Sequence, residues 1–173
     1  NQMTDNGHDY SYGAGIRVGW QGEVSPGLTL GASATSKIYM SELSDYKGLF
    51  AEQGDFDIPP QVTLGLSWKT SSTSALNLDV QHIWFSQVDS VGNSITNFSN
   101  CSSFIAFQGG TGGSSANCFG GSSGPGFGWD DMTIVKAGYQ WQTANNWTWR
   151  VGASYGEQPI TETTLNILAP AVQ

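Results

Sequence analysis

The sequence predicts an all-β protein, and within that class part of an antiparallel transmembrane β-barrel of the bacterial outer membrane. Six segments alternate apolar and polar residues, which gives each strand one apolar and one polar face. The connections between these segments alternate short, long, short, long, short, as in a barrel with short periplasmic turns and long extracellular loops. Trp and Tyr gather at the segment ends, where membrane interfaces favour them.

The predicted strands have roughly the 9 to 13 residues that a tilted strand needs to cross the hydrocarbon. They are residues 12–24, 28–38, 61–69, 75–88, 131–143 and 147–157. Short polar connections rich in Pro, Gly, Ser and Asn separate the members of three hairpins. The two long connections, 39–60 and 89–130, are expected to be extracellular loops.

In the first hairpin, the alternation places Trp20 and Leu30 on the apolar face and Arg17 and Lys37 on the polar face. The second hairpin continues this pattern along 61–69 and begins it again at residue 75. The alternation becomes irregular near residue 82, where a histidine falls on the apolar face.

The third hairpin is regular. Val135 and Trp149 belong to its apolar face, and Lys136 and Arg150 belong to its polar face. We therefore expect a set of cations, Arg17, Lys37, Lys136 and Arg150, to face the barrel lumen and line the path of a ligand with an anionic head group. Pairing of these cations with acids of the same faces, such as Glu23 and Asp79, is an equally open interpretation.

The composition agrees with a membrane barrel. Only 12% of the 173 residues are charged, the net charge is −8, and no basic patch is present to bind nucleic acid. The acidic residues gather in the long connections and near the N-terminus. We expect no cofactor, metal site or catalytic residue, because no nucleophile–base pair, phosphate loop or metal-ligand spacing stands out.

The connection 89–130 contains two features of its own. Cys101 and Cys118 are predicted to form a disulfide, which the oxidising cell surface allows. The apolar side chains of this Gly/Ser-rich loop are expected either to capture a hydrophobic ligand from outside or to pack as a plug over the barrel mouth. They include Phe98, Phe104, Phe107 and Phe119.

Six strands are too few for a single-chain bacterial barrel, which begins at eight, and lipid does not tolerate an open sheet edge. We therefore expect the remaining strands to come from the same protein or from another chain. A secreted jelly-roll glycosidase with Glu23 and Glu157 as its two carboxylates is a remote alternative. A barrel that serves only as an adhesin or structural surface protein is a stronger one.

Several segments resemble the FadL-type outer-membrane transporters of long-chain fatty acids and other hydrophobic compounds. Residues 124–131 (GPGFGWDD), followed by Lys136, Gly138 and Tyr139, resemble a recurring segment of that family. So do 147–152 (WTWRVG) with 157–160 (EQPI), 58–60 (IPP) leading into 62–65 (VTLG), and 166–170 (NILAP).

The resemblance implies a fourteen-stranded barrel plugged by an N-terminal hatch, of which this chain would carry about six strands from the second half. It implies passive uptake of fatty acids or other hydrophobic compounds, without bond chemistry. The implied partners are a hydrophobic small molecule, outer-membrane lipid and lipopolysaccharide, and the remaining strands and hatch. The long Gly/Ser-rich loop around Cys101 and Cys118 departs from the family pattern.

Overall fold

The computed structural model describes residue 3 and residues 5–145 and 147–160, and its largest element is one antiparallel sheet. The sheet runs β2-β3-β5-β6-β7-β8, with every strand beside its neighbour in sequence. These strands are β2 (Arg17–Ser25), β3 (Leu28–Thr35), β5 (Gln61–Ser71), β6 (Ser74–Ile83), β7 (Met132–Gln142) and β8 (Thr148–Gly156). The predicted antiparallel all-β class is confirmed, and the sheet is open, with β2 and β8 at its edges.

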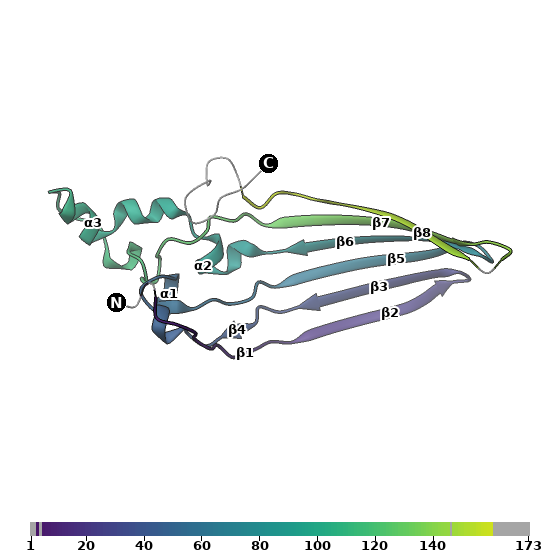
Figure 1. Ribbon diagram of the computed structural model, residues 1–173, viewed down its shortest axis with the longest axis horizontal. Helices are drawn as coiled ribbons and strands as arrows, with labels where there is room; N and C mark the ends of the chain where they lie inside the picture. Colours follow the sequence, from purple (N-terminus) through teal and green to yellow (C-terminus); the bar gives the residue numbers. More distant parts are fainter. Residues whose placement is uncertain (1–2, 4, 146, 161–173) are drawn as a thin grey trace.

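The tight turns all lie at one end of the sheet, and the long connections lie at the other, the loop end (Figure 1). The loop end carries a two-stranded sheet and several short helical segments. These are β1 (Gly13–Ala14), β4 (Tyr39–Met40), η1 (Ser44–Tyr46), α1 (Ala51–Gly54), η2 (Phe85–Gln87), α2 (Asp89–Gly92), η3 (Ile95–Asn100), α3 (Ser102–Phe107) and η4 (Ser115–Asn117). Among the described residues, no helix is long and apolar enough to cross a membrane.

Several strand boundaries differ from the sequence-based expectation, and the expected strand 28–38 ends at Thr35. The expected strand 75–88 stops at Ile83, because the next residue, Trp84, faces Pro60, which has no N–H with which to continue the ladder. Trp84 N donates instead to the Pro60 carbonyl oxygen at 3.1 Å, and the chain turns into η2 and α2. The expected strand 12–24 is divided into β1 and β2, and β1 pairs with β4 rather than with β3.

The register gives the sheet two different faces across all six strands. Directly paired residues point to the same side, so one row across the sheet is Trp20, Ala32, Leu64, Val80, Val135 and Tyr155. The next row is Gln21, Gly31, Gly65, Asp79, Lys136 and Ser154. We call the side of the first row the apolar face and the side of the second row the polar face.

The few buried side chains belong mostly to the loop end rather than to the sheet. Val88 before α2, Val91 within α2 and Ala51 of α1 are at most 5% exposed, whereas Leu64 on the apolar face is 61% exposed. An apolar face that is exposed over six strands is far larger than the patches that soluble monomers leave open to water. This face therefore requires an apolar environment outside the chain.

Candidate functional site

The polar face is interrupted by an apolar shelf at its loop end, formed by Ile83, Met132 and Ile134. Ile83 is paired with Met132, and Gln81 is paired with Ile134. The register therefore places three part-buried apolar side chains together on the face that is otherwise polar. Ile134 is paired on its other side with Gly156, so no side chain separates the shelf from the sheet edge.

Polar groups border the shelf. Gln81 Nε2 donates to Gln61 Oε1 at 2.5 Å, and Lys136 Nζ donates to Gln81 Oε1 at 3.4 Å. The two Gln side chains and the lysine are thus joined by hydrogen bonds. Small-molecule sites combine an apolar lining with a few placed polar groups, and the shelf and its border have this composition.

Farther from the loops, the polar face is rich in glycine and then becomes basic. Gly31 is paired with Gly65, and Gly138 is paired with Gly152, so these positions contribute no side chains of their own. At the turn end, a hollow of about 350 Å³ is lined by Lys69, Gln140, Thr148 and Arg150, among other residues. Lys69 and Arg150 belong to one row, with Ala75 and Gln140 between them.

Three of the four predicted lumen cations lie on the polar face, at different heights and on different strands. They are Arg17, Lys136 and Arg150. Lys37 lies beyond the end of β3, and its ammonium forms an ion pair with Asp57 at 2.8 Å. We therefore assign Lys37 to the base of the loops. The proposed alternative pairing with Glu23 or Asp79 is not formed, because the ion pairs of the described residues are Lys37–Asp57 and Lys47–Glu42.

Lys69 and the shelf residues were not predicted as site residues from the sequence. The irregular alternation near residue 82 indicated that Ile83, an apolar residue, falls on the polar face. The signal for Met132 and Ile134 was weaker, because they precede the regular part of their strand. Their proximity to Ile83 depends on the pairing of β6 with β7, which the sequence pattern does not specify.

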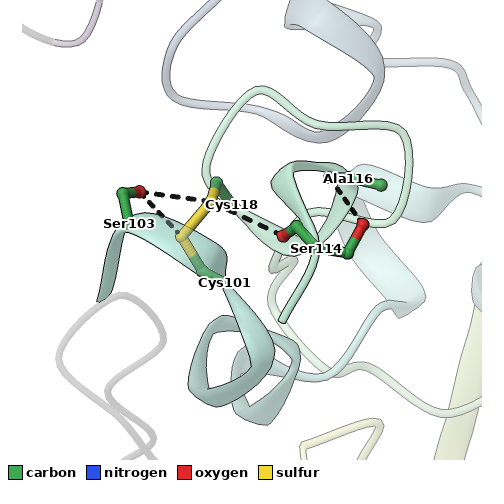
Figure 2. Close-up of a disulfide and its surroundings, with 5 residues drawn as sticks. All are labelled: Cys101, Ser103, Ser114, Ala116 and Cys118. Atoms are coloured by element: carbon green, nitrogen blue, oxygen red, sulfur yellow. Dashed lines mark hydrogen bonds between the residues drawn. A yellow bond between two sulfur atoms is a disulfide. The ribbon is translucent and has the colours of Figure 1, made fainter. Parts of the chain in front are cut away.

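The predicted disulfide between Cys101 and Cys118 is present (Figure 2). Ser103 Oγ lies 3.1 Å from Cys101 Sγ and 3.4 Å from Cys118 Sγ, and the serine is the donor because a disulfide sulfur carries no proton. Ser114 Oγ accepts from Ala116 N at 3.2 Å and starts the helical turn before Cys118. The bond therefore joins η3 and α3 to η4 in one compact arm.

The loop phenylalanines divide into two groups. Phe98 contacts both Phe104 and Phe119, with ring centroids 4.7 and 4.9 Å apart, so these three form a small cluster within the arm. Phe107 at the end of α3 is 89% exposed. The first group stabilises the arm itself, whereas the ring of Phe107 is exposed and makes no such contact within the described residues.

Replacing both cysteines with Ala is expected to loosen this arm by about 3 kcal/mol, because the unbonded loop regains chain entropy. Hydrogen exchange at Ile105 N, which donates to the Cys101 carbonyl at 3.0 Å, should speed up strongly. Ser103→Ala is the matched control and should change this exchange little. Equal protection in the double variant and the native protein would show that the aromatic cluster holds the arm without the disulfide.

The segment 124–129 is packed against α2 at the base of the long loop. Gly126 N and Gly128 N both donate to the Asn93 carbonyl, and Trp129 N donates to the Val91 carbonyl at 3.0 Å. A Cβ on Gly126 would lie 2.6 to 2.9 Å from three carbonyl oxygens of residues 89–93. Glycine is therefore required here by the close approach of two backbones.

Glu23 and Glu157, the remote candidates for a carboxylate pair, do not come together. Glu23 on the β2 edge accepts from Gly27 N at 2.7 Å, close to the tight turn. Glu157 follows β8 at the opposite edge and accepts from Thr133 N at 3.1 Å, at the loop end. Glycosidase carboxylates are ~5 to 10 Å apart, and five strand spacings alone separate these two by ~24 Å.

The geometry defines a class of fold: an open section of an antiparallel β-barrel with an apolar outer face, a polar inner face and long loops at one end. Among solved structures, the chain is similar to the CymD monoaromatic hydrocarbon channel, with a TM-score of 0.52 and 16% sequence identity. The match covers 86% of this chain and 38% of that channel, so the chain spans well under half of its length. No protein-family model and no curated protein sequence matches the chain.

Proposed function

We propose that this chain is part of a FadL-type outer-membrane channel that lets hydrophobic compounds cross passively. The observation that carries the proposal is the apolar shelf of Ile83, Met132 and Ile134 on the polar face, directly below the loops. A lumen that only conducted water and ions would gain nothing from an apolar surface there. The similarity to a hydrocarbon channel supports the same class of cargo.

The two faces support a location in the outer membrane, with the long loops outside. Trp68, Trp141 and Trp149 lie near the turn end of the apolar face, and Tyr12, Tyr39 and Tyr155 lie toward the loop end. Their spacing along the strands fits two aromatic belts at the two interfaces of a bilayer. The open edges at β2 and β8 would be paired with further strands of the closed barrel, because lipid cannot satisfy their backbone groups.

Long-chain fatty acids are the cargo that we favour. A fatty acid needs an apolar surface for its chain and a cationic or polar site for its carboxylate. The shelf supplies the first, and Lys69 and Arg150 around the turn-end hollow supply the second. In this proposal Phe107 captures the apolar chain outside, the shelf receives it at the barrel mouth, and the cations hold its head group farther in.

Ile134→Asn tests the proposal in the full-length protein. We expect initial uptake of a labelled long-chain fatty acid at low concentration to fall about fivefold, because a loss of ~1 kcal/mol of apolar contact corresponds to that ratio. Thr63→Asn is the matched control, since it changes the same row of the polar face two strands away.

The same measurement separates a channel from an adhesin. Cells without the protein should lose the uptake that cells with the native protein show. Equal uptake with and without the protein would leave a structural or adhesive surface barrel as the better account. Normal uptake by Ile134→Asn, with folding intact, would remove the shelf from the path.

A further inference from the structure

A cluster of charged and polar groups joins the two long connections at the base of the loop end. It contains Lys37 after β3, Asp55 and Asp57 after α1, the Met40 backbone in β4, and Ser90 in α2. Four separate parts of the chain therefore meet here. The cluster lies outside the strands of the large sheet and outside the path proposed above.

Asp57 is the centre of this cluster. Its side chain is 3% exposed, its Oδ2 lies 2.8 Å from Lys37 Nζ, and its Oδ1 accepts from Met40 N at 2.7 Å. Burial opposes its ionisation, but the Lys37 ammonium and the Met40 N–H outweigh burial and hold the pKa of Asp57 below its ordinary value. Burial alone would lower the pKa of Lys37. The hydrogen bond to Asp57 and the negative charge of Asp57 outweigh burial and raise the pKa of Lys37 above its ordinary value.

Asp55 is in the opposite situation. Its main-chain carbonyl accepts the Ser90 hydroxyl, and Ser90 is 2% exposed, so the backbone of Asp55 is fixed against α2. Its Oδ1 is buried and accepts no hydrogen bond within the described part of the chain. Burial, followed by the adjacent Asp57 carboxylate, raises the pKa of Asp55 to about 6.

The charged groups that act on Asp55 are few. Asp57 and Glu52 come from its own segment, and Lys37 comes from the end of β3. The contact from α2 is the uncharged hydroxyl of Ser90. Lys37 is already paired with Asp57, so a second ionised carboxylate at Asp55 would face mainly like charge.

We propose that Asp55 and Asp57 share one proton, and that this proton stabilises the packing of the two long loops against each other at their base. Protonated Asp55 donates to the Asp57 carboxylate, which keeps its bonds to Lys37 and Met40 N. When the proton leaves, two carboxylates remain side by side beside one ammonium, and the contact between the 51–57 segment and α2 loosens. The stability of the loop base thus depends on this proton, and this dependence is independent of what the barrel carries.

The sign of the pH dependence follows from the two carboxyl groups. Asp55 has a raised pKa in the folded loop, so its contribution is present below its ordinary value of 3.8 and is lost as the pH rises through about 6. Asp57 has a lowered pKa, so its contribution is present above its ordinary value of 3.8 and is lost as the pH falls through its folded value. The loop base is therefore most stable between these two limits, in mildly acidic solution.

The test is a pH series on the full-length protein with two readouts. The first is the infrared band of a protonated carboxyl group, which reports the proton directly. The second is hydrogen exchange at Met40 N and Glu52 N, corrected for intrinsic rates, because these amides donate to Asp57 and to the Gly121 carbonyl of the second long connection. From pH 5 to pH 7.5, we expect the band to disappear and the protection to fall by about tenfold.

Asp55→Asn is the decisive variant, because an amide N–H imitates the protonated carboxyl group at every pH. We expect it to lack the band and to keep high protection from pH 5 to pH 7.5. Asp57→Asn should lower the protection at every pH, since Lys37 loses its partner. Glu42→Gln, which alters the exposed pair with Lys47, is the control and should behave as the native protein.

Two outcomes would overturn the proposal. One is a native protein whose band and protection do not change between pH 5 and pH 7.5. The other is an Asp55→Asn variant with the same band and the same step as the native protein, which would place the proton on another group. Either result leaves the channel proposal untouched, since that proposal is tested by uptake through Ile134.

Discussion

Leu64→Lys is expected to prevent stable insertion of the protein into the outer membrane. Leu64 lies on the apolar face of β5, three positions from the loop end of that strand, and is 61% exposed within the chain, so in a barrel it faces the hydrocarbon. A lysine on the lipid face costs about 2 to 4 kcal/mol at the bilayer midplane and less toward the interfaces. The measurement is the fraction of folded protein in the outer membrane, or the free energy of folding into lipid vesicles.

Thr63→Lys is the matched control, one residue away on the same strand. Thr63 is paired with Ser33 and Gln81 on the polar face, where a lysine can be hydrated. We expect this variant to insert almost normally. Equal loss of insertion in both variants would mean that the two faces do not meet different environments, and a soluble sheet would then be the better account.

Gly126→Ala is expected to detach the 124–129 segment from α2. The added Cβ would meet the carbonyl oxygens of Asp89, Ser90 and Asn93 at 2.6 to 2.9 Å, and backbone cannot give way as a side chain does. We expect a loss of about 2 to 3 kcal/mol in local stability, which is the usual size of an overpacking effect. Exchange at Trp129 N, bonded to the Val91 carbonyl, should speed up by roughly 30-fold or more.

The control for this prediction is Gly138→Ala on the polar face of β7. There the nearest atom to an added Cβ is the Val151 carbonyl oxygen at 3.8 Å, an ordinary contact. Exchange at Trp129 N should be unchanged in this variant. Native-like protection in Gly126→Ala would show that the segment is not held by this close approach.

The strands and their two faces were predictable because a half-buried strand imposes a period of two on its own sequence. The exposed apolar row through Leu64 and Val135 shows that this pattern was correctly assigned. The early end of β6 is caused by Pro60, which is visible in the sequence before β5. Its effect on β6 could not be predicted, because it depends on Pro60 lying opposite residue 84.

The loop end was much less predictable. Its helical segments are three to six residues long, too short for a helical period to appear in the sequence. Lys37 and Asp57 are 20 positions apart, and Ser90 contacts a carbonyl 35 positions earlier. The sequence therefore suggested a lumen cation and a gathering of acidic residues in the long connections, whereas tertiary contacts assemble an ion pair around the buried Asp57.

The central claim, that one face meets lipid and the other meets water, is tested most directly by labelling neighbouring positions in β7. Both native cysteines are used in the disulfide, so Val135→Cys and Lys136→Cys each introduce a single free thiol. In native outer membranes we expect a lipid-soluble thiol reagent to label position 135 and a small water-soluble reagent to label position 136. Lipid-phase labelling at 136 with none at 135 would contradict the assignment of the two faces and the channel that rests on it.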